Sequence, residues 1–523
     1  MTRATISDFL RSHAVVRPER AAYIYCHGDI TWGELDRRVD RLAAGLYARG
    51  IRAGDVIAVC VTDGPVQIEL LYATARVGAT RVGLNYRFAS ADIVKLIAHS
   101  GARLVVAETQ FMPLLAGSQP ELGFVDAGNG QDQLHEYEAL TESVVTAVPA
   151  HTGENPFAQI CYTTGSTGSP KGALWRHSAL LNAIAFTALE LGFREEDVFL
   201  HCLPAAGVPS VAAIWNCALG FTTVVVPRFQ TDLVLDMMAM HGCTLALMVP
   251  TMLTEVCEAA EARPRELSRM RRIYYGSAPT TPALIQRCMR IFQGVDFEQI
   301  YGSTEGIGGW FTKLTPADHL HALAHDEGLL ASCGRPMVHC LVQIIDDKGT
   351  PAPAGEIGEI RVRGDFVMDG YLHDEALTRE ALRDGWLVTG DIGRLDKQGY
   401  LYIVDRKQFM IITGGYNVYP VEIENVIAQH PSVVEVSVFG IPDEKWGEAI
   451  HAAVVLRRGC AHDSETIRAW CHEKLARFKT PKSIEIRDQL IRGATGKIQK
   501  RAERDRFMAL SHCSCRVLAP REH

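Results

Sequence analysis

The middle of the chain alternates short apolar runs with longer amphipathic stretches, and this alternation restricts the fold more than any other feature. The apolar runs are rich in β-branched residues and are bounded by Gly, Pro or small polar residues, as buried strands are. They lie at Val198–Leu203, Thr222–Val226, Leu245–Val249, Arg272–Tyr275 and Val295–Tyr301. Because helix-like stretches follow several of them, we expect an α/β architecture with largely parallel sheets. Ligands of such folds bind in loops at the carboxyl ends of strands.

One of the helix-like stretches in the middle region begins at Ser178, a suitable N-cap, and runs to Gly192. The patterns on either side of Asp405 differ from this alternation of strands and helices. From Glu356 to Tyr402, short strands separated by Gly turns predict a small β-rich subdomain. A new α/β pattern follows Asp405, with strands at Val433–Phe439 and Ala452–Leu456 and a helix at Ser464–Leu475.

Length and charge also indicate more than one domain. The chain has 523 residues, which is more than a single domain usually holds. Residues 406–523 contain 19 Lys and Arg against 14 Asp and Glu, a net +5, and the other 405 residues contain 34 against 47, a net −13. The contrast is either a chance difference between two surfaces or a basic lid that serves a polyanionic ligand. The overall charge of −8 argues against a general nucleic-acid binder.

The composition also indicates the cellular compartment of the protein. No stretch approaches the roughly 18 uninterrupted apolar residues of a membrane span, so stable membrane insertion is not expected. Charged residues are scattered through Met1 to Arg20, where a signal peptide would be apolar. The 14 cysteines are therefore expected to be reduced thiols in the cytoplasm.

The strongest local signal is a loop rich in hydroxyl and glycine residues that directly follows the strand-like Phe157–Tyr162. It reads Thr163-Thr164-Gly165-Ser166-Thr167-Gly168-Ser169-Pro170-Lys171-Gly172. Hydroxyl groups, backbone N–H groups and an ammonium group in this arrangement can surround a phosphate. The loop is not a Walker A motif, because Pro170 stands where a Gly should precede the Lys. Taken alone, it is equally consistent with an ordinary turn.

Five further motifs follow this loop in order along the chain. They are Tyr301-Gly302-Ser303-Thr304-Glu305, Thr389-Gly390-Asp391, Asp405-Arg406-Lys407, Gly414-Gly415-Tyr416-Asn417-Val418 and Gly496-Lys497. With these six motifs the chain resembles, from about Ile6 to Phe507, the adenylate-forming superfamily of acyl-CoA synthetases, peptide-synthetase adenylation domains and luciferases. Within that superfamily it is most similar to the acyl- or aryl-CoA ligases.

The resemblance implies a domain organisation and an activity. Residues 1–405 would form a large N-terminal AMP-binding domain of two α/β subdomains and a small β-rich subdomain, and residues 406–523 a small, mobile α+β lid domain. The activity would be ATP-dependent ligation of a carboxylic acid to CoA, with Mg²⁺. The acid and ATP would give an acyl-adenylate and pyrophosphate, and the CoA thiolate would then displace AMP.

Two alternatives remain beside this activity. An adenylating ligase of the same family would pass the acyl group to an amine, a hydroxyl or a separate carrier protein. A nucleotide-binding protein without turnover is disfavoured because Glu305, Asp391 and Lys497 are all present. The expected partners are small molecules rather than nucleic acid, and a homodimer is left open.

The resemblance also assigns residues to the ATP site. Tyr301 would stack on adenine, opposite Gly276-Ser277-Ala278, and Asp391 would accept hydrogen bonds from the ribose hydroxyls with Arg406 nearby. Thr304 would donate to a phosphate and Glu305 would hold Mg²⁺, a hard cation that prefers oxygen ligands. The remaining predicted ATP-binding residues are Thr163, Thr164, Gly165, Ser166, Thr167, Gly168, Lys171, Gly302 and Ser303.

Lys497 would be the catalytic lysine of the lid. Attack of a carboxylate on the α-phosphorus of ATP brings two anions together, and a positioned ammonium group offsets that repulsion. Lys500, which has basic neighbours, is predicted to be an ordinary solvated lysine. The lid would rotate about Gln408, a position that is usually Asp or Lys in the family.

Two further sites are predicted for CoA and for the acid. Gly414, Gly415 and Tyr416 would form the face that admits the pantetheine arm, with Trp446 beside it, although Trp446 is equally consistent with an ordinary, partly buried Trp. The acyl pocket would be lined by Ala206, Gly207, Val249 and Gly308. Gly207 stands where many relatives carry a His, so small apolar residues predict a roomy pocket for a fatty, alicyclic or aryl acid.

A cluster of histidines completes the candidates. His319, His321 and His325 lie close together, and the last two have the i, i+4 spacing of a metal-binding pair. A third ligand with suitable spacing is missing from the sequence, so a solvated helix is the preferred interpretation.

Overall fold

The structure is a computed structural model that describes residues 4–128, 135–142, 155–163, 170–457, 459–460, 464–493 and 498–516. By their internal contacts the residues form two compact units. The first unit comprises Met1–Gln343, Arg361–Thr389 and Asp396–Leu401, and the second comprises Ile344–Ile360, Gly390–Leu395 and Tyr402–His523.

A six-stranded sheet of the first unit has the order β6-β5-β3-β4-β7-β8. Its strands are β3 (Val56–Cys60), β4 (Thr80–Gly83), β5 (Ala102–Ala107), β6 (Phe124–Asp126), β7 (Phe157–Thr163) and β8 (Lys171–Arg176). All neighbouring strands are parallel except β8, which runs antiparallel to β7. The crossovers between parallel strands contain α3 (Pro65–Val77) and α4 (Ser90–Ser100), which makes this sheet a βαβ assembly.

A nine-stranded sheet, the second of this unit, has the order β15-β14-β13-β12-β11-β9-β10-β1-β2. Its strands are β1 (Ala21–Tyr25), β2 (Gly28–Thr31), β9 (Val198–His201), β10 (Thr222–Val225), β11 (Leu245–Met248), β12 (Arg272–Gly276), β13 (Asp296–Gly302), β14 (Trp310–Leu314) and β15 (Arg335–Pro336). The six central strands are parallel and the outer ones antiparallel. The predicted α/β architecture with largely parallel sheets is therefore confirmed.

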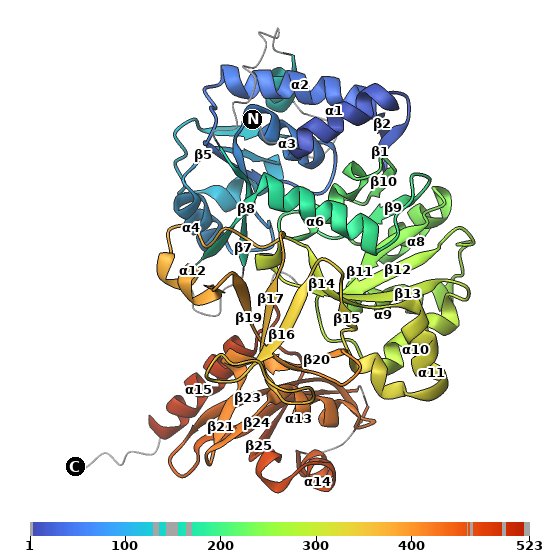
Figure 1. Ribbon diagram of the computed structural model, residues 1–523. Helices are drawn as coiled ribbons and strands as arrows, with labels where there is room; N and C mark the ends of the chain where they lie inside the picture. The colour runs from blue at the N-terminus through green and yellow to red at the C-terminus, as the bar shows by residue number, and fades with distance from the viewer. Residues whose placement is uncertain are drawn as a thin grey trace, which may run out of the picture. The chain divides into compact units, whose positions relative to one another are not determined.

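Helices accompany these strands in the predicted rhythm. They are α1 (Ile6–Val16), α2 (Trp32–Ala48), α5 (His135–Thr141), α6 (His177–Glu190), α7 (Pro209–Ala213), α8 (Thr231–Met240), α9 (Pro250–Ala262), α10 (Pro282–Ile291), α11 (Pro316–His325) and α12 (Glu375–Ala381). In Figure 1 the blue helices α1, α2 and α3 pack against one another. The N-cap predicted for α6 was wrong, because the helix begins at His177 and Ser178 lies inside it. Among the described residues, no helix is both long enough and apolar enough to cross a bilayer.

The second unit contains its own five-stranded sheet, β22-β21-β24-β23 with β25 beside β24. Its strands are β21 (Ile411–Thr413), β22 (Tyr416–Val418), β23 (Val433–Asp443), β24 (Gly447–Leu456) and β25 (Ser483–Arg487). Three helices, α13 (Pro420–Ala428), α14 (Ser464–Lys474) and α15 (Lys500–Arg516), pack on this sheet or on each other. The strands and the helix predicted after Asp405 are present, and their core includes Ile423, Val438, Ile450 and Ile467.

The Gly-rich region before Asp405 forms a further small sheet with the order β16-β17-β19-β18, in which β20 also pairs with β19. Its strands are β16 (Leu341–Ile345), β17 (Gly358–Arg363), β18 (Leu382–Arg383), β19 (Trp386–Leu395) and β20 (Leu401–Arg406). The predicted β-rich subdomain is therefore present.

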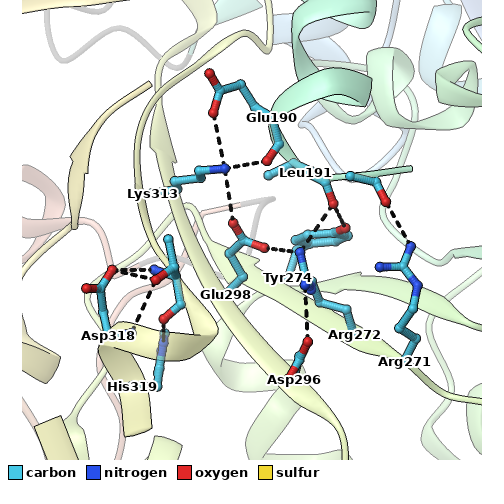
Figure 2. A network of polar contacts seen from close by, with 12 residues as sticks. Glu190, Leu191, Arg271, Arg272, Tyr274, Asp296, Glu298, Lys313, Asp318 and His319 are labelled. Carbon is cyan, nitrogen blue, oxygen red and sulfur yellow. Dashed lines mark hydrogen bonds and ion pairs between the residues drawn. The ribbon is translucent and has the colours of Figure 1, made fainter. Parts of the chain in front are cut away.

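Buried ion pairs hold β12, β13 and β14 together. Lys313 of β14 lies between two carboxylates, with its Nζ 3.1 Å from Glu190 and 3.8 Å from Glu298 (Figure 2). Arg272 of β12 reaches Glu298 from the other side at 2.7 Å. Because Glu298 is almost completely buried and its carboxylate is shared by two cations, removing either cation would leave a poorly compensated charge. The network fixes the strand β13, which leads into Tyr301–Glu305.

Candidate functional site

Four of the predicted motifs meet at one edge of the nine-stranded sheet. The parallel strands β9, β11, β12 and β13 are neighbours, so their carboxyl ends lie at the same edge. Ala206 and Gly207 follow β9, Val249 follows β11, and Ser277 and Ala278 follow β12. Tyr301 and Gly302 end β13, and Ser303 to Glu305 follow it. Residues that are about 100 positions apart in the sequence thus line the edge at which α/β folds bind ligands.

Gly276 is placed where no larger residue fits. It pairs with Ile300 of the neighbouring strand, and a methyl group on Gly276 would lie 2.1 Å from the Ile300 carbonyl oxygen. The next residue, Ser277, is exposed and has a φ of 66°, an uncommon conformation for a residue with a side chain. The predicted adenine-binding segment is therefore a closely packed strand end followed by a sharp change of direction.

His319 supports this strand end from α11. Its Nδ1 lies 2.8 Å from the Thr315 carbonyl oxygen, and its Nε2 lies 2.7 Å from the hydroxyl of Tyr275. A carbonyl only accepts, so Nδ1 carries the proton and Nε2 accepts from Tyr275. Burial lowers the pKa of His319, which keeps the ring neutral. The prediction of a solvated histidine was wrong for His319.

The other two histidines of the cluster, His321 and His325, are exposed. Within the described ranges there is no group of three His, Cys, Asp or Glu side chains that could hold a metal ion.

Thr304 and Glu305 are anchored by groups that the sequence did not identify. The hydroxyl of Tyr371 donates to Oε1 of Glu305 at 2.8 Å, and the indole of Trp175 donates to the Thr304 carbonyl oxygen at 3.0 Å. The backbone N–H of Met368 donates to the Glu305 carbonyl oxygen at 2.8 Å. Glu305 is thereby fixed in direction while remaining partly accessible.

Tyr371 reaches Glu305 because its segment runs along β8. Leu174 N–H donates to the Gly370 carbonyl oxygen at 2.9 Å, and Leu372 N–H donates to the Gly172 carbonyl oxygen at 2.8 Å. No local motif in the sequence marks Tyr371, and only its pairing across the fold reveals the contact.

In the sequence, the predicted phosphate loop joins β7 to β8, which pair as a hairpin. Thr163 and Lys171 face each other as the last paired residues of this hairpin. The predicted ATP-binding residues Thr164, Gly165, Ser166, Thr167 and Gly168 lie outside the described residues. The hairpin end and Glu305 are nevertheless linked within one unit, since β8 carries Trp175 and pairs with the Tyr371 segment.

The chemistry of this edge fits a nucleotide with a bound Mg²⁺. Hydroxyl groups of Thr163 and Thr304 and the ammonium group of Lys171 are suitable donors to phosphate. The buried Oγ of Ser303 has no hydrogen-bond partner within the described part of the chain. Mg²⁺ is usually held by one or two carboxylates together with phosphate oxygens, so Glu305 alone suffices on the protein side.

The predicted walls of the acyl pocket contact each other through two valines. A methyl group on Gly308 would lie 3.1 Å from Val211 and 3.3 Å from Val208, the residue after Gly207. Ile307, directly before Gly308, is fully buried and has a φ of 56°, which is an outlier for a β-branched residue. Such strain persists only where the surrounding packing holds the backbone. The pocket wall is therefore tightly determined by its neighbours.

In the second unit, Asp391 and Arg406 form an ion pair. Arg406 Nε lies 3.0 Å from Oδ1 of Asp391, and the Asp391 side chain is only 7% exposed, against 58% for Arg406. The sequence placed these residues together at the ribose, and the structure brings them into contact. Asp405 accepts from its neighbour Arg406 N–H at 2.6 Å and from Val421 N–H at 2.9 Å, so the chain after β20 is held to α13.

Lys500 is not the solvated lysine predicted from the sequence. Its Nζ lies 2.9 Å from Glu424 and 3.9 Å from Asp405, and its side chain is 14% exposed. Burial raises the pKa of Glu424, and the neighbouring ammonium group opposes that shift. The prediction for Lys500 was wrong because its partner Glu424 lies 76 residues away in the sequence.

Two further residues were predicted to act in the lid, the hinge residue Gln408 and the catalytic Lys497. Gln408, the predicted hinge, is exposed in the short 3₁₀ helix Lys407–Phe409. Lys500 stands 5.5 Å from the ring centre of Phe409. Lys497 lies outside the described residues.

The predicted CoA residues form an exposed aromatic and basic face on the second unit. Gly414 N–H donates to the Trp446 carbonyl oxygen at 2.8 Å, and a methyl group on Gly414 would lie 2.8 Å from the Trp446 ring. Tyr416 stacks on Phe478, with ring centres 4.7 Å apart. The exposed surfaces of Tyr416, Phe478 and Trp446 are 59%, 41% and 39%. At 39% exposure Trp446 is partly buried, which agrees with both interpretations of this residue.

Two lysines flank this face. Lys445 and Lys482 each place Nζ 5.0 Å from the Trp446 ring centre. Phe478 and Lys482 belong to none of the sequence motifs and come from the segment after α14, more than 60 residues beyond Gly414. Rings beside ammonium groups suit a ligand that combines a flat base with phosphates.

Most of the chain matches known proteins. A family model described as AMP-binding enzyme matches residues 10–372, and one described as AMP-binding enzyme C-terminal domain matches residues 422–497. An indoleacetate–CoA ligase of Aromatoleum aromaticum is 34% identical over 519 residues, which cover 95% of this chain and 96% of the relative.

Two solved structures are similar in fold as well as sequence. The o-succinylbenzoate CoA synthetase of Bacillus subtilis, in complex with its acyl-adenylate intermediate, has a TM-score of 0.84 and 28% identity, covering 96% of this chain and 98% of that one. The amide bond synthetase McbA of Marinactinospora thermotolerans has a TM-score of 0.84 and 28% identity, covering 96% and 99%.

Proposed function

This chain belongs to the family of AMP-binding enzymes and is an ATP-dependent carboxylic acid–CoA ligase, and we propose that its acid is an aryl acid or another largely apolar acid. The ligase activity predicted from the sequence is confirmed, with ATP and CoA as co-substrates and Mg²⁺ as the metal ion. The observation that carries the adenylation site is the anchoring of Glu305 and Thr304 at the carboxyl end of β13, beside the hairpin of the phosphate loop.

The reaction proceeds in two displacements. A carboxylate oxygen of the acid bonds to the α-phosphorus of ATP, and the bond between the α-phosphorus and its bridging oxygen breaks to release pyrophosphate. The thiolate sulfur of CoA then bonds to the acyl carbon, and the carbon–oxygen bond to phosphate breaks to release AMP. The thiol proton passes to solvent. Activation as a mixed anhydride divides one difficult condensation into two easier steps.

The residues of the first unit act on the first displacement in this proposal. Glu305 would hold Mg²⁺, which neutralises phosphate charge when bound, and Tyr371 keeps the Glu305 carboxylate oriented. Lys497 would approach the same phosphates and reduce repulsion between the two anions. The role of Lys497 is supported by its Gly496-Lys497 motif.

We propose a division at residue 405, with residues 1–405 for ATP and the acid and residues 406–523 as the lid. The match to the AMP-binding enzyme model ends at residue 372, before this boundary, and the match to the C-terminal domain model begins at residue 422, after it. Gln408 would be the hinge residue. An amide lacks the charge that Asp or Lys brings, so its rotation would depend less on ionic strength.

The second displacement would take place at the aromatic and basic face. Gly414 and Gly415 both have positive φ, 58° and 82°, and no atom approaches within 4 Å of a methyl group built on Gly415. A narrow pantetheine arm can pass such a backbone closely, because no side chain projects there. Trp446, Phe478 and Lys482 would contact the remainder of CoA.

Small apolar groups line the proposed acyl site. Ala206, Gly207, Val249 and Gly308 contribute little side-chain volume, and Val208 and Val211 close the gap between the two walls. A site lined by small apolar side chains favours a flat ring or a branched hydrocarbon over a short polar acid. The indoleacetate–CoA ligase is named for an acid of the aryl class.

A second candidate acceptor follows from the amide bond synthetase, whose fold is equally similar. In that case the adenylate would pass to an amine and not to CoA.

Mass spectrometry of the products distinguishes these functions. The purified protein is incubated with ATP and Mg²⁺ and with indole-3-acetate, benzoate or octanoate, in the presence of CoA, of an amine, or of neither. We expect acyl-CoA and AMP when CoA is present, with indole-3-acetate or benzoate preferred over octanoate. Adenylate that persists in the presence of CoA but is consumed by the amine would replace our proposal with the amide ligase.

We further propose a cytoplasmic location and small-molecule partners rather than nucleic acid. All twelve cysteines for which the structure describes a side chain are free thiols, ten of them buried, which suits a reducing compartment. A monomer and a homodimer would both carry out the reaction, since each chain contains all of the named residues.

A further inference from the structure

One residue beside the acyl pocket is held at both backbone polar groups by buried ionisable side chains. Ala205 N–H donates to Oδ1 of Asp63 at 2.9 Å, and the Ala205 carbonyl oxygen accepts from the guanidinium of Arg81 at 3.1 Å. Ala205 is 1% exposed and directly precedes Ala206 and Gly207. A loop with both groups of one residue fixed in this way has little freedom to shift.

Arg81 ties this loop to two further elements. It lies in β4, is 1% exposed, and donates to Gln159 of β7 at 2.8 Å and to Gln67 of α3 at 3.0 Å. Burial lowers the pKa of Arg81 to about 10, so the side chain remains charged at neutral pH. The planar guanidinium fixes the directions of all its acceptors, which a lysine ammonium does not. The phosphate-loop strand β7 and the Ala205 loop therefore share one rigid group.

Asp63 approaches from the loop after β3. It is 7% exposed, and its Oδ1 lies 4.0 Å from Nε2 of the buried His201. Burial raises the pKa of Asp63 to about 7, while the Ala205 N–H and the charge of Arg81 oppose the rise. An acid with this pKa keeps an acceptor oxygen for Ala205 in either protonation state. The contact needs an acceptor, not a negative charge.

Close backbone packing completes the arrangement. A methyl group on Gly83, the last residue of β4, would lie 2.1 Å from the Ala206 carbonyl oxygen and 2.7 Å from the Ala206 carbonyl carbon. The loop therefore rests directly on the strand that carries Arg81.

From these contacts we infer that Asp63 and Arg81 are positioning residues that fix the Ala206–Gly207 wall and thereby set how well the enzyme binds its acid. The inference rests on the proposed function, because that function makes the wall part of the acid site. Neither side chain touches the acid in this inference. They act on it through the Ala205 backbone.

Hydrogen–deuterium exchange tests the contacts without any substrate. Exchange is followed in peptides covering Leu203–Val208 in the wild type and in Asp63→Asn, Asp63→Leu and Arg81→Met. We expect Asp63→Leu and Arg81→Met to speed exchange in this loop about tenfold, because a buried N–H or C=O loses its partner. Asp63→Asn, which retains an acceptor oxygen, should exchange like the wild type.

Acid-dependent pyrophosphate exchange tests the consequence for the acid. This assay requires adenylation alone, so it reports on the acid site whether CoA or an amine is the acceptor. With indole-3-acetate as the acid, we expect Asp63→Leu to raise the KM for the acid about tenfold and the KM for ATP less than twofold. Asp63→Asn should stay within threefold of the wild type for both.

The control is Arg103→Met, which removes an arginine of β5, a strand of the same sheet that does not pair with β4; Arg103 binds Asp55 and Glu121, each at 2.6 Å. It should change neither the loop exchange nor the KM for the acid. Equal increases in both KM values in Asp63→Leu would indicate general loss of structure and overturn the inference, as would unchanged exchange in the loop. If the wild type makes no acyl-CoA, the proposal that CoA is the acceptor fails. Hydrogen–deuterium exchange and pyrophosphate exchange still test the inference, because neither measurement requires CoA.

Discussion

The ATP and acid sites of the first unit and the CoA face of the second unit are built in opposite ways. At the ATP and acid sites, a methyl group on Gly276 or Gly83 would lie 2.1 Å from a backbone oxygen, and the loop before Gly207 is fixed by buried polar groups. On the CoA face, Gly415 has open space around it, and Tyr416 and Trp446 are substantially exposed. One region is rigid and enclosed, and the other is open to solvent.

The difference corresponds to the two half-reactions. An acyl-adenylate is a reactive anhydride, and walls that exclude water protect it from hydrolysis. CoA is large and polyanionic, so an exposed face with rings and ammonium groups can bind it without burying its phosphates. The comparison suggests that substitutions in each region should affect one half-reaction and spare the other.

Lys497→Ala gives the largest expected effect and the sharpest test of this division. Lys497 belongs to the region of the CoA face by sequence, yet we expect it to serve adenylation. Loss of the ammonium group should lower acid-dependent pyrophosphate exchange about 10³-fold, the scale seen when a preorganised electrostatic group is removed. Supplied acyl-adenylate should still react with CoA at a rate close to that of the wild type. Pyrophosphate exchange and thioester formation are measured separately.

Lys500→Ala is the matched control for a nearby lysine. It removes the partner of Glu424 and should lower stability, but pyrophosphate exchange by the protein that remains folded should stay within tenfold of the wild type. Near wild-type exchange in Lys497→Ala would sink the assignment of Lys497.

The sequence predicted the strands and the motif ends well because both depend on local patterns. The run Leu245–Val249 is found as β11, Leu245–Met248, and Thr222–Val226 as β10, Thr222–Val225. Gly276 and Glu305 fall at carboxyl ends of parallel strands, which the α/β pattern alone led us to expect.

The contacts that hold the site could not be predicted in this way. Tyr371 reaches Glu305 across 66 residues, and Trp175 reaches Thr304 across 129, with no periodic signal in either segment. Lys500 and His319 were assigned to solvent because their residue types are usually exposed. Their burial depends on single partners, Glu424 and Tyr275, that only the folded chain brings near.

The pH dependence of stability gives the second test, because Asp63 is a buried acid that contacts the loop before Gly207. The folded state raises the pKa of Asp63 to about 7, well above the roughly 3.9 of an exposed Asp. The unfolded chain therefore loses the proton first, and the contribution of Asp63 to stability falls as pH rises from about 4 to about 7. In Asp63→Asn this fall is absent. Between pH 5 and pH 8 the variant should gain about 2 kcal/mol in free energy of unfolding relative to wild type.

Urea unfolding of both proteins at the two pH values measures this difference. The control is Asp505→Asn, which replaces an exposed acid of the second unit and should leave the pH dependence unchanged. If Asp63→Asn and wild type lost stability in parallel, Asp63 would not be the buried titrating acid that the enclosed region requires.

The CoA face gives the smallest expected effect, because an exposed ring contributes less than an enclosed contact. Trp446→Ala removes the ring that lies against Gly414 and between Lys445 and Lys482. We expect the KM for CoA to rise about tenfold, which corresponds to the roughly 1–3 kcal/mol of a base or arm stacked on an aromatic ring. Pyrophosphate exchange should be unchanged, since adenylation needs no CoA. Trp386→Ala, which removes a ring in the first unit that stacks with Arg361 at 4.6 Å, is the matched control and should leave the KM for CoA unaltered. A Trp446→Ala variant that lost adenylation and thiolation equally would show that the two regions are not separate in function.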